Sequence, residues 1–339
     1  MMHSTTSMAV LGDGGWGTTL AIHLYRLGHR VRWWGAFPDY VRLLARRREN
    51  PKFLAGVAIP PRLAITADLG EALRDATLVV LAVPSQHLRG VLHQMRRYPL
   101  AGKAFVSVAK GIETRTLKRM SQVMTQVLGP VPIAVLSGPN IAPEIARGHP
   151  ASSVVASTRA RLAANVQQAF MSERFRVYTS RDVIGVELGG SLKNPVAIAA
   201  GIGDGLGFGA NAKAALITRG VVEMARLGVA MGAASETFWG LSGLGDLITT
   251  CLGGRNRWLG EQLGKGARLS EALAHTEMVI EGVETTKAAV ALGRRAGVEL
   301  PIIEQVYAVL FRRKAPATAL RSLMERARKA EFASFRRRG

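Results

Sequence analysis

A glycine-rich segment near the start of this 339-residue chain has the spacing of a dinucleotide-binding turn. It reads Gly12-Asp13-Gly14-Gly15-Trp16-Gly17, follows the apolar run Met8–Leu11 and opens a helical pattern that Gly28 closes. In such a turn the first glycine permits the bend, the second lets the backbone approach a pyrophosphate, and the third lets helix and strand pack closely. Free N–H groups at the helix start attract the phosphates. We therefore expect Gly12, Gly14 and Gly17 to form a cofactor-binding turn.

The sequence leaves the choice between NAD and NADP open. An acidic residue at the end of the second strand usually binds the adenosine ribose of NAD, and an arginine nearby accommodates the 2′-phosphate of NADP. The positions expected there are Gly35, Ala36 and Phe37. Arg32 is near but lies within the predicted strand. Both cofactors remain alternatives.

Polar, glycine-flanked segments recur at the predicted ends of further strands and in the second half of the chain. They are Val83-Pro84-Ser85, Ala109-Lys110-Gly111, Ser137-Gly138-Pro139-Asn140, Leu192-Lys193-Asn194-Pro195, Ser242–Asp246 and Gly254-Arg255-Asn256-Arg257. In open α/β sheets, ligands bind beyond the carboxyl ends of the strands. We therefore expect the first three segments to face the cofactor.

The elements that must position these residues alternate between strand and helix in the first half of the chain. Predicted strands cover Met8–Leu11, Val31–Trp34, Leu78–Val83, Phe105–Ala109 and Ile133–Leu136, and two more at Ser153–Ala156 and Phe175–Tyr178 extend the sheet. This order predicts a doubly wound parallel sheet of the Rossmann type with extra strands. From 184 onward only helical patterns appear, with one helix opening at Pro301.

These patterns predict three parts: a dinucleotide-binding domain over 1–183, a helical substrate domain over 184–330 and a basic tail over 331–339. The single cysteine, Cys251, excludes an internal disulfide and favours a reducing, cytoplasmic location. No segment has the pattern of a signal peptide or a membrane span.

The net charge of +21, from 45 Lys and Arg against 24 Asp and Glu, is the most unusual global property. Such a field attracts phosphates, nucleic acids and anionic membranes. A solvated arginine-rich surface is the simpler interpretation, because no nucleic-acid-binding motif is present and specific binding of nucleic acid is not expected. A weak association of the basic segment Arg312–Gly339 with anionic membranes is an alternative left open.

Taken together, the segments resemble the bacterial NAD(P)-dependent glycerol-3-phosphate dehydrogenases. The matching stretches keep their order from about Met8 to Arg328, and they include GDGGWGTTLA, VAKGIE, SGPNIAPEIA, VELGGSLKNPVAIAAGI, LSGLGDLITTC, GRNRWLG and VIEGVETT. Members of this family reduce dihydroxyacetone phosphate to sn-glycerol 3-phosphate, the backbone precursor of phospholipids. The resemblance implies the same reaction here, with NAD or NADP as cofactor and a small phosphorylated substrate.

The resemblance also implies roles for individual residues. Lys193 matches the catalytic lysine. Substrate contacts are implied for Lys110, Gly138, Asn140, Lys193, Asn194, Asp246, Gly254, Arg255 and Asn256. Cofactor contacts are implied for Gly15, Trp16, Lys110, Ala142, Arg255, Val279 and Glu281. Two of these positions depart from the family pattern, since Asn140 replaces serine or threonine and Gly254 stands where serine is frequent. An amide can still donate a hydrogen bond to a phosphate through its NH₂ group.

These residue types suit the reduction of a ketone. As a hypothesis, Lys193 donates a proton to the carbonyl oxygen while the nicotinamide delivers hydride. Burial and a second cation, Lys110, lower its pKa toward neutrality, Asp246 orients the ammonium, and Asn194 positions Lys193 or the carbonyl. Arg255 binds phosphate with its planar fork, and Asn256 adds a neutral donor.

Simpler interpretations stand beside these. Asp246 can act as a helix N-cap after Gly245, and Arg255 and Asn256 can be ordinary loop residues. Cys251 fits a small buried residue, the histidines are scattered, and no spacing indicates a metal site. A related dehydrogenase acting on a hydroxyacid or a sugar phosphate is a second enzymatic alternative. A homodimer is the expected oligomer, because it is the common default.

Overall fold

The computed structural model describes residues 5–328, 330 and 331. The chain forms two compact units, the first comprising Met1–Ala109 and Met120–Val183, and the second Lys110–Arg119 and Ile184–Gly339. The segment Lys110–Arg119 therefore packs with the second unit, although the sequence places it between strands of the first. Of the predicted tail at 331–339, only Glu331 lies within the described residues.

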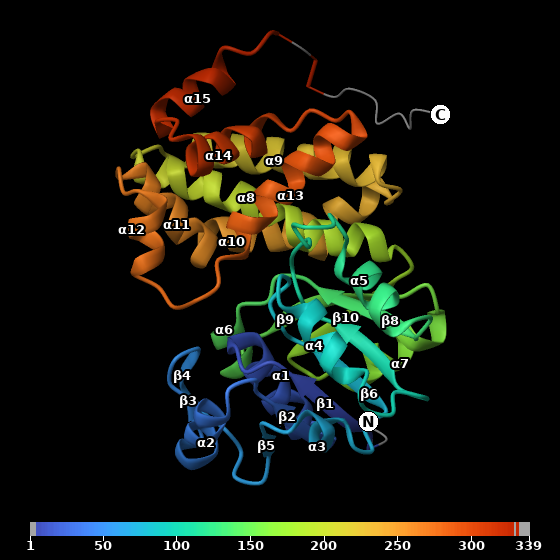
Figure 1. The fold of residues 1–339 in the computed structure, drawn as a ribbon. Helices are drawn as coiled ribbons and strands as arrows, with labels where there is room; N and C mark the ends of the chain where they lie inside the picture. The colour runs from blue at the N-terminus through green and yellow to red at the C-terminus, as the bar shows by residue number, and fades with distance from the viewer. Residues whose placement is uncertain (1–4, 329, 332–339) are drawn as a thin grey trace. The chain divides into compact units, whose positions relative to one another are not determined.

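The first unit is a sheet with helices on both faces (Figure 1). Its strands are β1 (Ser7–Leu11), β2 (Arg30–Trp34), β3 (Glu49–Asn50), β4 (Leu54–Ala58), β5 (Ala64–Thr66), β6 (Leu78–Leu81), β7 (Ala104–Ser107), β8 (Ile133–Ser137), β9 (Ala151–Ala156) and β10 (Phe175–Ser180). Its helices are α1 (Gly15–Arg26), α2 (Pro38–Arg47), α3 (Leu69–Leu73), α4 (Leu88–Met95), α5 (Met120–Leu128), α6 (Ala142–Ala146) and α7 (Ala160–Phe170).

The sheet confirms the predicted fold class. Its strands lie in the order β10-β9-β8-β7-β6-β1-β2-β5, and every pair from β8 through β5 is parallel. The two extra strands join the sheet as expected, but β9 runs antiparallel to β8. The short strands β3, β4 and β5 have no counterpart in the sequence prediction, because runs of two to five residues carry too little periodicity.

Successive residues of β1 belong to two different cores, which is why the strand is apolar from Met8 to Leu11. Met8 and Val10 pack with α1 and α7 on one face of the sheet, and Ala9 and Leu11 pack with α3, α4 and α5 on the other. The central strands end at one edge of the sheet because they are parallel. The glycine turn after β1 and the polar segments after β6 and β8 therefore lie along the same edge.

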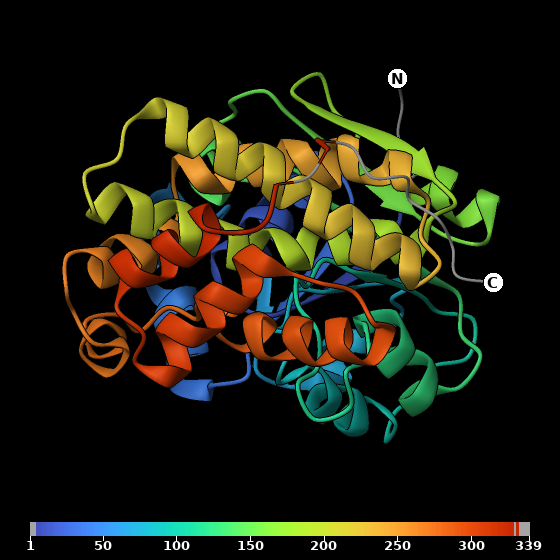
Figure 2. The same ribbon diagram turned by 90° about the horizontal axis from the view of Figure 1, so that it is seen from above.

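The second unit is helical over its described residues. Its elements are α8 (Val183–Gly205), α9 (Ala210–Ala230), a 3₁₀ helix η1 (Ser235–Trp239), a π-helical turn η2 (Leu241–Gly245), α10 (Asp246–Leu252), α11 (Arg255–Gly264), α12 (Leu269–Ala274), α13 (Glu281–Ala296), α14 (Pro301–Arg312) and α15 (Pro316–Met324). Helix α8 is buried along most of its length and contributes to two hydrophobic cores. It lies beside α9 (Figure 2), where Gly220 packs against Val196.

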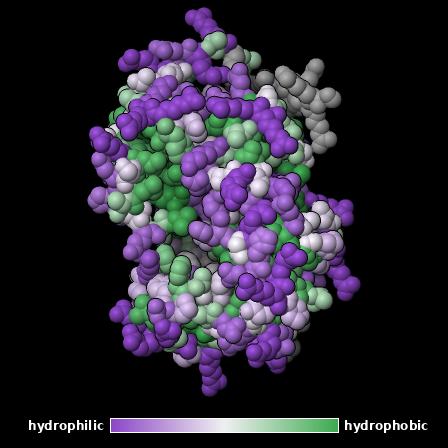
Figure 3. Space-filling view, in the orientation of Figure 1, coloured by the Kyte–Doolittle hydropathy of each residue, from purple (hydrophilic) through white to green (hydrophobic). Residues whose placement is uncertain are grey.

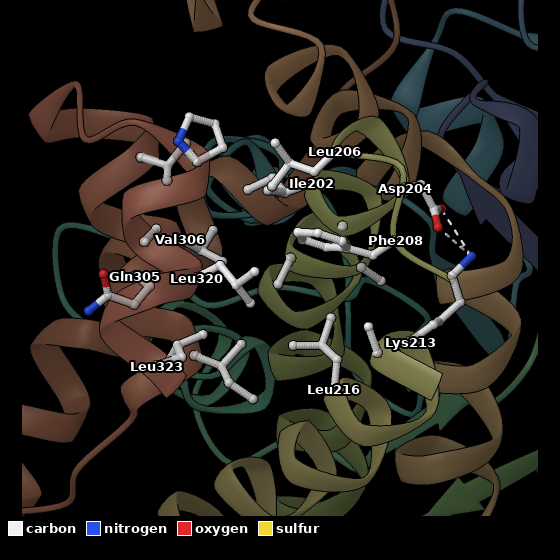
Figure 4. Close-up of a pocket in the computed structure, with 18 of the residues that line it drawn as sticks. Ile202, Asp204, Leu206, Phe208, Lys213, Leu216, Gln305, Val306, Leu320 and Leu323 are labelled. Atoms are coloured by element: carbon white, nitrogen blue, oxygen red, sulfur yellow. Dashed lines mark hydrogen bonds and ion pairs between the residues drawn. The ribbon is translucent and has the colours of Figure 1, made fainter. Parts of the chain in front are cut away.

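An apolar cavity of about 90 Å³ lies between α8, α9, α14 and α15 within this unit. Figure 4 shows Val306, Leu320 and Leu323 on one side and the Asp204–Lys213 ion pair on the other. Asp204 also accepts a hydrogen bond from Arg257 Nε at 2.6 Å. Hydrophilic side chains predominate on the face drawn in Figure 3, with smaller hydrophobic patches among them. None of the described helices is long and apolar enough to cross a membrane.

A buried carboxylate at the start of α14 leads to a stability prediction. Glu223 on α9 accepts hydrogen bonds from the backbone N–H groups of Ile302 and Ile303, at 2.7 and 3.3 Å. Replacing Glu223 by alanine leaves both donors buried without this acceptor. Each unsatisfied group costs about 1–3 kcal/mol, so we expect the free energy of unfolding to fall by ~2–5 kcal/mol in urea denaturation.

The surface pair Glu299–Arg326 provides the matched control, because Glu299 is exposed and its replacement by alanine should cost less than ~1 kcal/mol. Burial raises the pKa of Glu223 to about 7, from 4.5. The folded state then holds a proton that the unfolded chain releases, so this group's contribution to stability falls as the pH rises from about 4.5 through 7. Equal losses for the two alanine variants would contradict the capping role.

Candidate functional site

The glycine turn in the first unit has the geometry that its motif predicts. Gly12 has φ of +124°, which favours glycine. A Cβ at Gly17 would lie 2.1 Å from the carbonyl oxygen of Gly12, so helix α1 approaches the turn more closely than a larger residue permits. Gly14 has no atom within 4 Å of the place of its absent Cβ, which leaves its backbone open to a ligand. Helix α1 begins at Gly15 without a side-chain cap.

Two other observations in this unit fit a bound dinucleotide. The indole Nε1 of Trp16 is buried and has no hydrogen-bond partner among the described residues. Gly15 lies against the carbonyl oxygen of Phe53 and near Ala142, the first residue of α6. A bound nicotinamide dinucleotide would therefore be held by the turn from Gly12 to Gly17, with phosphates at the start of α1.

Asn50 holds this turn in place, and sequence reasoning missed it. Its amide nitrogen donates to the carbonyl oxygen of Asp13 at 2.8 Å and to the hydroxyl of Thr18 at 2.7 Å. Its amide oxygen accepts from the Tyr40 hydroxyl at 2.5 Å and from the backbone N–H of Phe53 at 3.0 Å. A lone asparagine after a helix gives no signal in the sequence, because the partners come from four separate segments.

Gly138 and Asn140 follow β8 at the same edge of the sheet. Gly138 has φ of +150° and passes close to the backbone of Ser152 and Ser153. The amide oxygen of Asn140 accepts a hydrogen bond from the Ser153 hydroxyl at 2.8 Å. Its NH₂ group is buried and unpartnered within the described part of the chain, so it has donors left for a ligand.

In the second unit, glycines of α8 bring the reactive side chains together. A Cβ at Gly189 would lie 2.7 Å from the carbonyl oxygen of Ser242, and one at Gly201 would lie 1.9 Å from that of Arg257. The chain around η2 and helix α11 can therefore pack directly on the α8 backbone. This packing places Asp246, at the start of α10, and Asn256, in the first turn of α11, beside Lys193 and Asn194.

Lys193 is 6% exposed, and its ammonium is held by two acceptors. Its Nζ donates to Asp246 Oδ1 at 2.8 Å and to the Thr250 hydroxyl at 2.6 Å. The other carboxylate oxygen of Asp246 accepts from Lys110 Nζ at 2.6 Å. One carboxylate therefore bridges two ammonium groups.

The surroundings lower the pKa of Lys193 from 10.5 to about 8. Burial is the main cause, and the neighbouring charge of Lys110 acts in the same direction, whereas Asp246 opposes both. The predicted shift toward neutrality is thus present, although the second cation contributes less than burial. Thr250, which the sequence analysis did not select, also donates its hydroxyl to the carbonyl oxygen of Asp246 at 2.7 Å.

The side chains of Asn194 and Asn256 are hydrogen-bonded to each other. Asn256 donates to the amide oxygen of Asn194 at 2.9 Å and accepts from the backbone N–H of Gly282 at 3.0 Å. Asn194 also donates to the carbonyl oxygen of Lys110 at 3.5 Å. Asn194 therefore fixes the backbone of Lys110 and the side chain of Asn256, and no hydrogen bond joins it to the Lys193 ammonium among the described contacts.

Arg255 is exposed at the start of α11, after Gly254 with φ of +99°. Its Nη1 donates to the carbonyl oxygen of Val279 at 2.9 Å, which ties it to the segment just before α13. Glu281 is the first residue of α13. Lys110, Lys193, Asn194, Asp246, Arg255 and Asn256 thus gather in the second unit, whereas Gly138, Asn140, Ala142 and the glycine turn belong to the first.

Comparison with known proteins identifies the family. Residues 7–163 match the family model described as NAD-dependent glycerol-3-phosphate dehydrogenase N-terminus, and residues 182–321 match the C-terminal model. The chain belongs to the NAD-dependent glycerol-3-phosphate dehydrogenase family. The resemblance expected from the sequence is therefore confirmed, together with the oxidoreductase class and the NAD(P) cofactor class.

Relatives and solved structures of this family cover nearly the whole chain. Glycerol-3-phosphate dehydrogenase [NAD(P)+] from Chlorobium limicola is 48% identical over 329 residues, which is 96% of this chain and 99% of the relative. A crystal structure of glycerol-3-phosphate dehydrogenase from Coxiella burnetii superposes with a TM-score of 0.92 at 38% identity, over 95% of this chain and 99% of that one. The Saccharomyces cerevisiae enzyme gives 0.81 at 27% identity, over 95% and 100%.

The structure tests three of the simpler interpretations of the sequence, which concern Asp246, the pair Arg255 and Asn256, and Cys251. The N-cap residue of α10 is Gly245 and Asp246 is the first residue of the helix, so the N-cap interpretation is wrong. Arg255 and Asn256 stand in the first turn of a helix and are not loop residues. Cys251 is fully buried and its pKa is raised to about 12 by burial, in line with a structural role. The described residues contain no cluster of metal-ligating side chains.

Proposed function

We propose that this chain catalyses the reversible reduction of dihydroxyacetone phosphate to sn-glycerol 3-phosphate with NADH or NADPH. In this proposal the first unit binds the dinucleotide and the second unit holds the groups that act on the substrate. The observation that carries it is the buried Lys193 ammonium, held by Asp246 and Thr250 in a member of the glycerol-3-phosphate dehydrogenase family. The product would supply the backbone of phospholipids.

Lys193 acts as the general acid in this scheme. When bound, the nicotinamide supplies hydride to the carbonyl carbon. Lys193 Nζ donates a proton to the carbonyl oxygen, and the reverse reaction returns the proton to the neutral amine. Asp246 and Thr250 fix the direction of Nζ, and Lys110 favours loss of its proton. Burial keeps water from competing for the same proton.

The phosphate of the substrate needs donors that carry charge or remain unpaired. Arg255 has a fork of donors of which only Nη1 is bonded to Val279 in the described contacts. Asn256 is oriented by Asn194 and Gly282, and Gly254 precedes them at the start of α11. We assign phosphate binding in the second unit to Arg255 and Asn256. In the first unit, the NH₂ group of Asn140, two residues after Gly138, is a further donor without a partner among the described residues.

A substrate panel tests the proposal. Dihydroxyacetone phosphate should cause loss of nicotinamide absorbance with NADH or NADPH, whereas a hydroxyacid-derived ketone and dihydroxyacetone without phosphate should react much more slowly. The unphosphorylated ketone is the matched control, because it differs only in the group that Arg255 is assigned to bind. No oxidation of either cofactor by dihydroxyacetone phosphate would refute the proposal.

The lowered pKa of Lys193 predicts opposite pH profiles for the two directions. Ketone reduction requires the ammonium form, so kcat for reduction should decline as the pH rises through about 8. Oxidation of glycerol 3-phosphate requires the neutral amine, so its rate should rise over the same range and then level off. Initial rates in both directions at saturating cofactor measure this, and parallel profiles would exclude Lys193 as the group that carries the proton.

The expectations on partners and location are also proposals. We propose that the chain forms a homodimer, which sedimentation of the purified chain measures, and that it lies in the cytoplasm, where its single cysteine would stay reduced. Weak binding to anionic membranes would concern the basic segment from Arg312 to Gly339, whose last residues lie outside the described part of the chain. Liposome sedimentation of the full chain, compared with a chain that ends before Arg312, tests this association, which should weaken with salt.

A further inference from the structure

The glycine turn places a carboxylate at the end of β2, where sequence reasoning found none. A Cβ at Gly35, the residue after β2, would lie 2.7 Å from Asp13 Oδ2 and 3.2 Å from Asp13 Cβ. The Asp13 side chain therefore lies directly against the Gly35 backbone. In Rossmann folds this end of the second strand normally carries the acidic residue that accepts a hydrogen bond from the adenosine ribose of NAD.

Gly35 explains why the acidic residue is absent from its usual position. Any side chain at Gly35 would collide with Asp13 of the turn and with Val41 of α2, so the space beside Gly35 is already filled. The two residues act as a pair: the glycine removes a side chain and the aspartate supplies one. The carboxylate thus arrives at the same edge of the sheet from the first loop instead of the second strand.

The carboxylate of Asp13 lacks a full set of donors. Its Oδ2 is buried and accepts no hydrogen bond from the residues that the structure describes. Burial raises the pKa of Asp13, while its own backbone N–H and the charge of Lys52 act in the opposite direction. A carboxylate short of donors is a good acceptor for a sugar hydroxyl, and a poor neighbour for a phosphate.

Two cationic side chains near the end of β2 are Arg32, which is bonded to other residues, and Lys52, which is exposed. The guanidinium of Arg32 donates to the carbonyl oxygen of Arg74 and pairs with Asp75 at 3.5 Å. The ammonium of Lys52 lies 5.3 Å from the centre of the Phe53 ring, on an exposed side chain. The Phe37 ring, 69% exposed just beyond Gly35, offers apolar surface and no charge. The Arg32 guanidinium is thus already bonded to other groups, and Phe37 carries no charge that could bind a 2′-phosphate.

From this juxtaposition we infer that Asp13 is a specificity-determining residue, which accepts a hydrogen bond from the adenosine ribose and disfavours a 2′-phosphate, so that the chain prefers NAD(H) to NADP(H). The inference deepens the proposed function and rests on it only in that a dinucleotide binds at the turn. It chooses between the two cofactors that the sequence leaves open.

Binding measured without turnover tests this inference. Titration of nicotinamide fluorescence should give a Kd for NADPH at least about tenfold higher than for NADH in the unaltered chain. Asp13→Asn keeps the shape of the side chain and removes its negative charge. The Kd for NADPH divided by the Kd for NADH should therefore fall at least about tenfold, mainly through tighter NADPH binding. The ratio in the unaltered chain should also decrease with added salt, because salt screens the repulsion.

Asp39→Asn is the matched control, because it removes a carboxylate of the same region whose side chain is 94% exposed. Its Kd ratio should equal that of the unaltered chain. Asp13→Ser provides a second variant if the asparagine impairs folding, as judged by thermal denaturation. Calorimetry with AMP and with adenosine 2′,5′-bisphosphate, which differ only in the 2′-phosphate, measures the same preference without the nicotinamide half.

Three outcomes would overturn the inference. They are equal affinity for NADH and NADPH in the unaltered chain, tighter binding of NADPH that Lys52→Ala abolishes, and a Kd ratio that neither Asp13 variant changes. The proposed function fails separately, through absence of dihydroxyacetone phosphate reduction by a chain that still binds either cofactor.

Discussion

The Lys193→Ala variant should lose about 10²–10⁴-fold in kcat for ketone reduction while it binds the dinucleotide with nearly unchanged affinity. The reason is that Lys193 Nζ, the proposed proton donor, is buried in the second unit, whereas the glycine turn belongs to the first. Stopped-flow or steady-state rates give kcat, and fluorescence titration gives the cofactor Kd. The two measurements separate loss of the proton donor from loss of binding.

Two further variants sharpen this experiment. Lys193→Arg retains a positive charge but does not release a proton near neutral pH, so it should be nearly as inactive as the alanine variant. Lys287→Ala removes a lysine whose ion pair with Glu284 is on the surface, and its kcat should equal that of the unaltered chain. Near-normal turnover in either Lys193 variant would assign the proton transfer to another group.

The second large effect is expected for Asp246→Asn. The carboxylate is 2% exposed and bridges Lys193 and Lys110, so its removal leaves two ammonium groups close together without a counter-charge. Breaking a buried ion pair costs about 3–5 kcal/mol, and we expect a loss of this order in the free energy of unfolding. The pKa of Lys193 should fall as well, because the charge that raises it is gone.

The lower pKa predicts a distinctive pH profile. The decline of kcat for ketone reduction should begin at lower pH in Asp246→Asn than in the unaltered chain, in addition to any fall in its maximum. Thr250→Val is the comparison variant, because it removes one acceptor from Lys193 without removing charge. An unshifted profile in Asp246→Asn, measured on protein that remains folded, would show that this carboxylate does not control the protonation of Lys193.

The fold was largely predictable because its signals are local. Apolar strands of the central sheet, the glycine turn and the proline that opens α14 each carry a pattern within a few residues. The direction of β9 was not predictable, because a strand of six residues has the same pattern whether it pairs parallel or antiparallel. The small strands and the packing of Lys110–Arg119 with the second unit depend on distant partners.

The residues of the candidate site were also predictable from local patterns, whereas the contacts between them were not. Lys193, Asp246 and Asn256 lie in matching stretches and were selected from the sequence, but their mutual geometry depends on how α8, α10 and α11 pack. Thr250 escaped because a threonine four residues after an aspartate in a helix is common. Asn50 and the contact of Asp13 with Gly35 escaped because each joins segments more than twenty residues apart.

The glycines of α8 have a consequence for how this chain tolerates change. Gly189 and Gly201 carry no reactive atoms, yet the backbones of Ser242 and Arg257 leave no space for even a methyl group at either position. A methyl group there would push the neighbouring segments away from α8 and pull Asp246 or Asn256 out of reach of their partners. In a library of random variants, substitutions at Gly189 and Gly201 should therefore be found among the inactive clones as often as substitutions at Lys193.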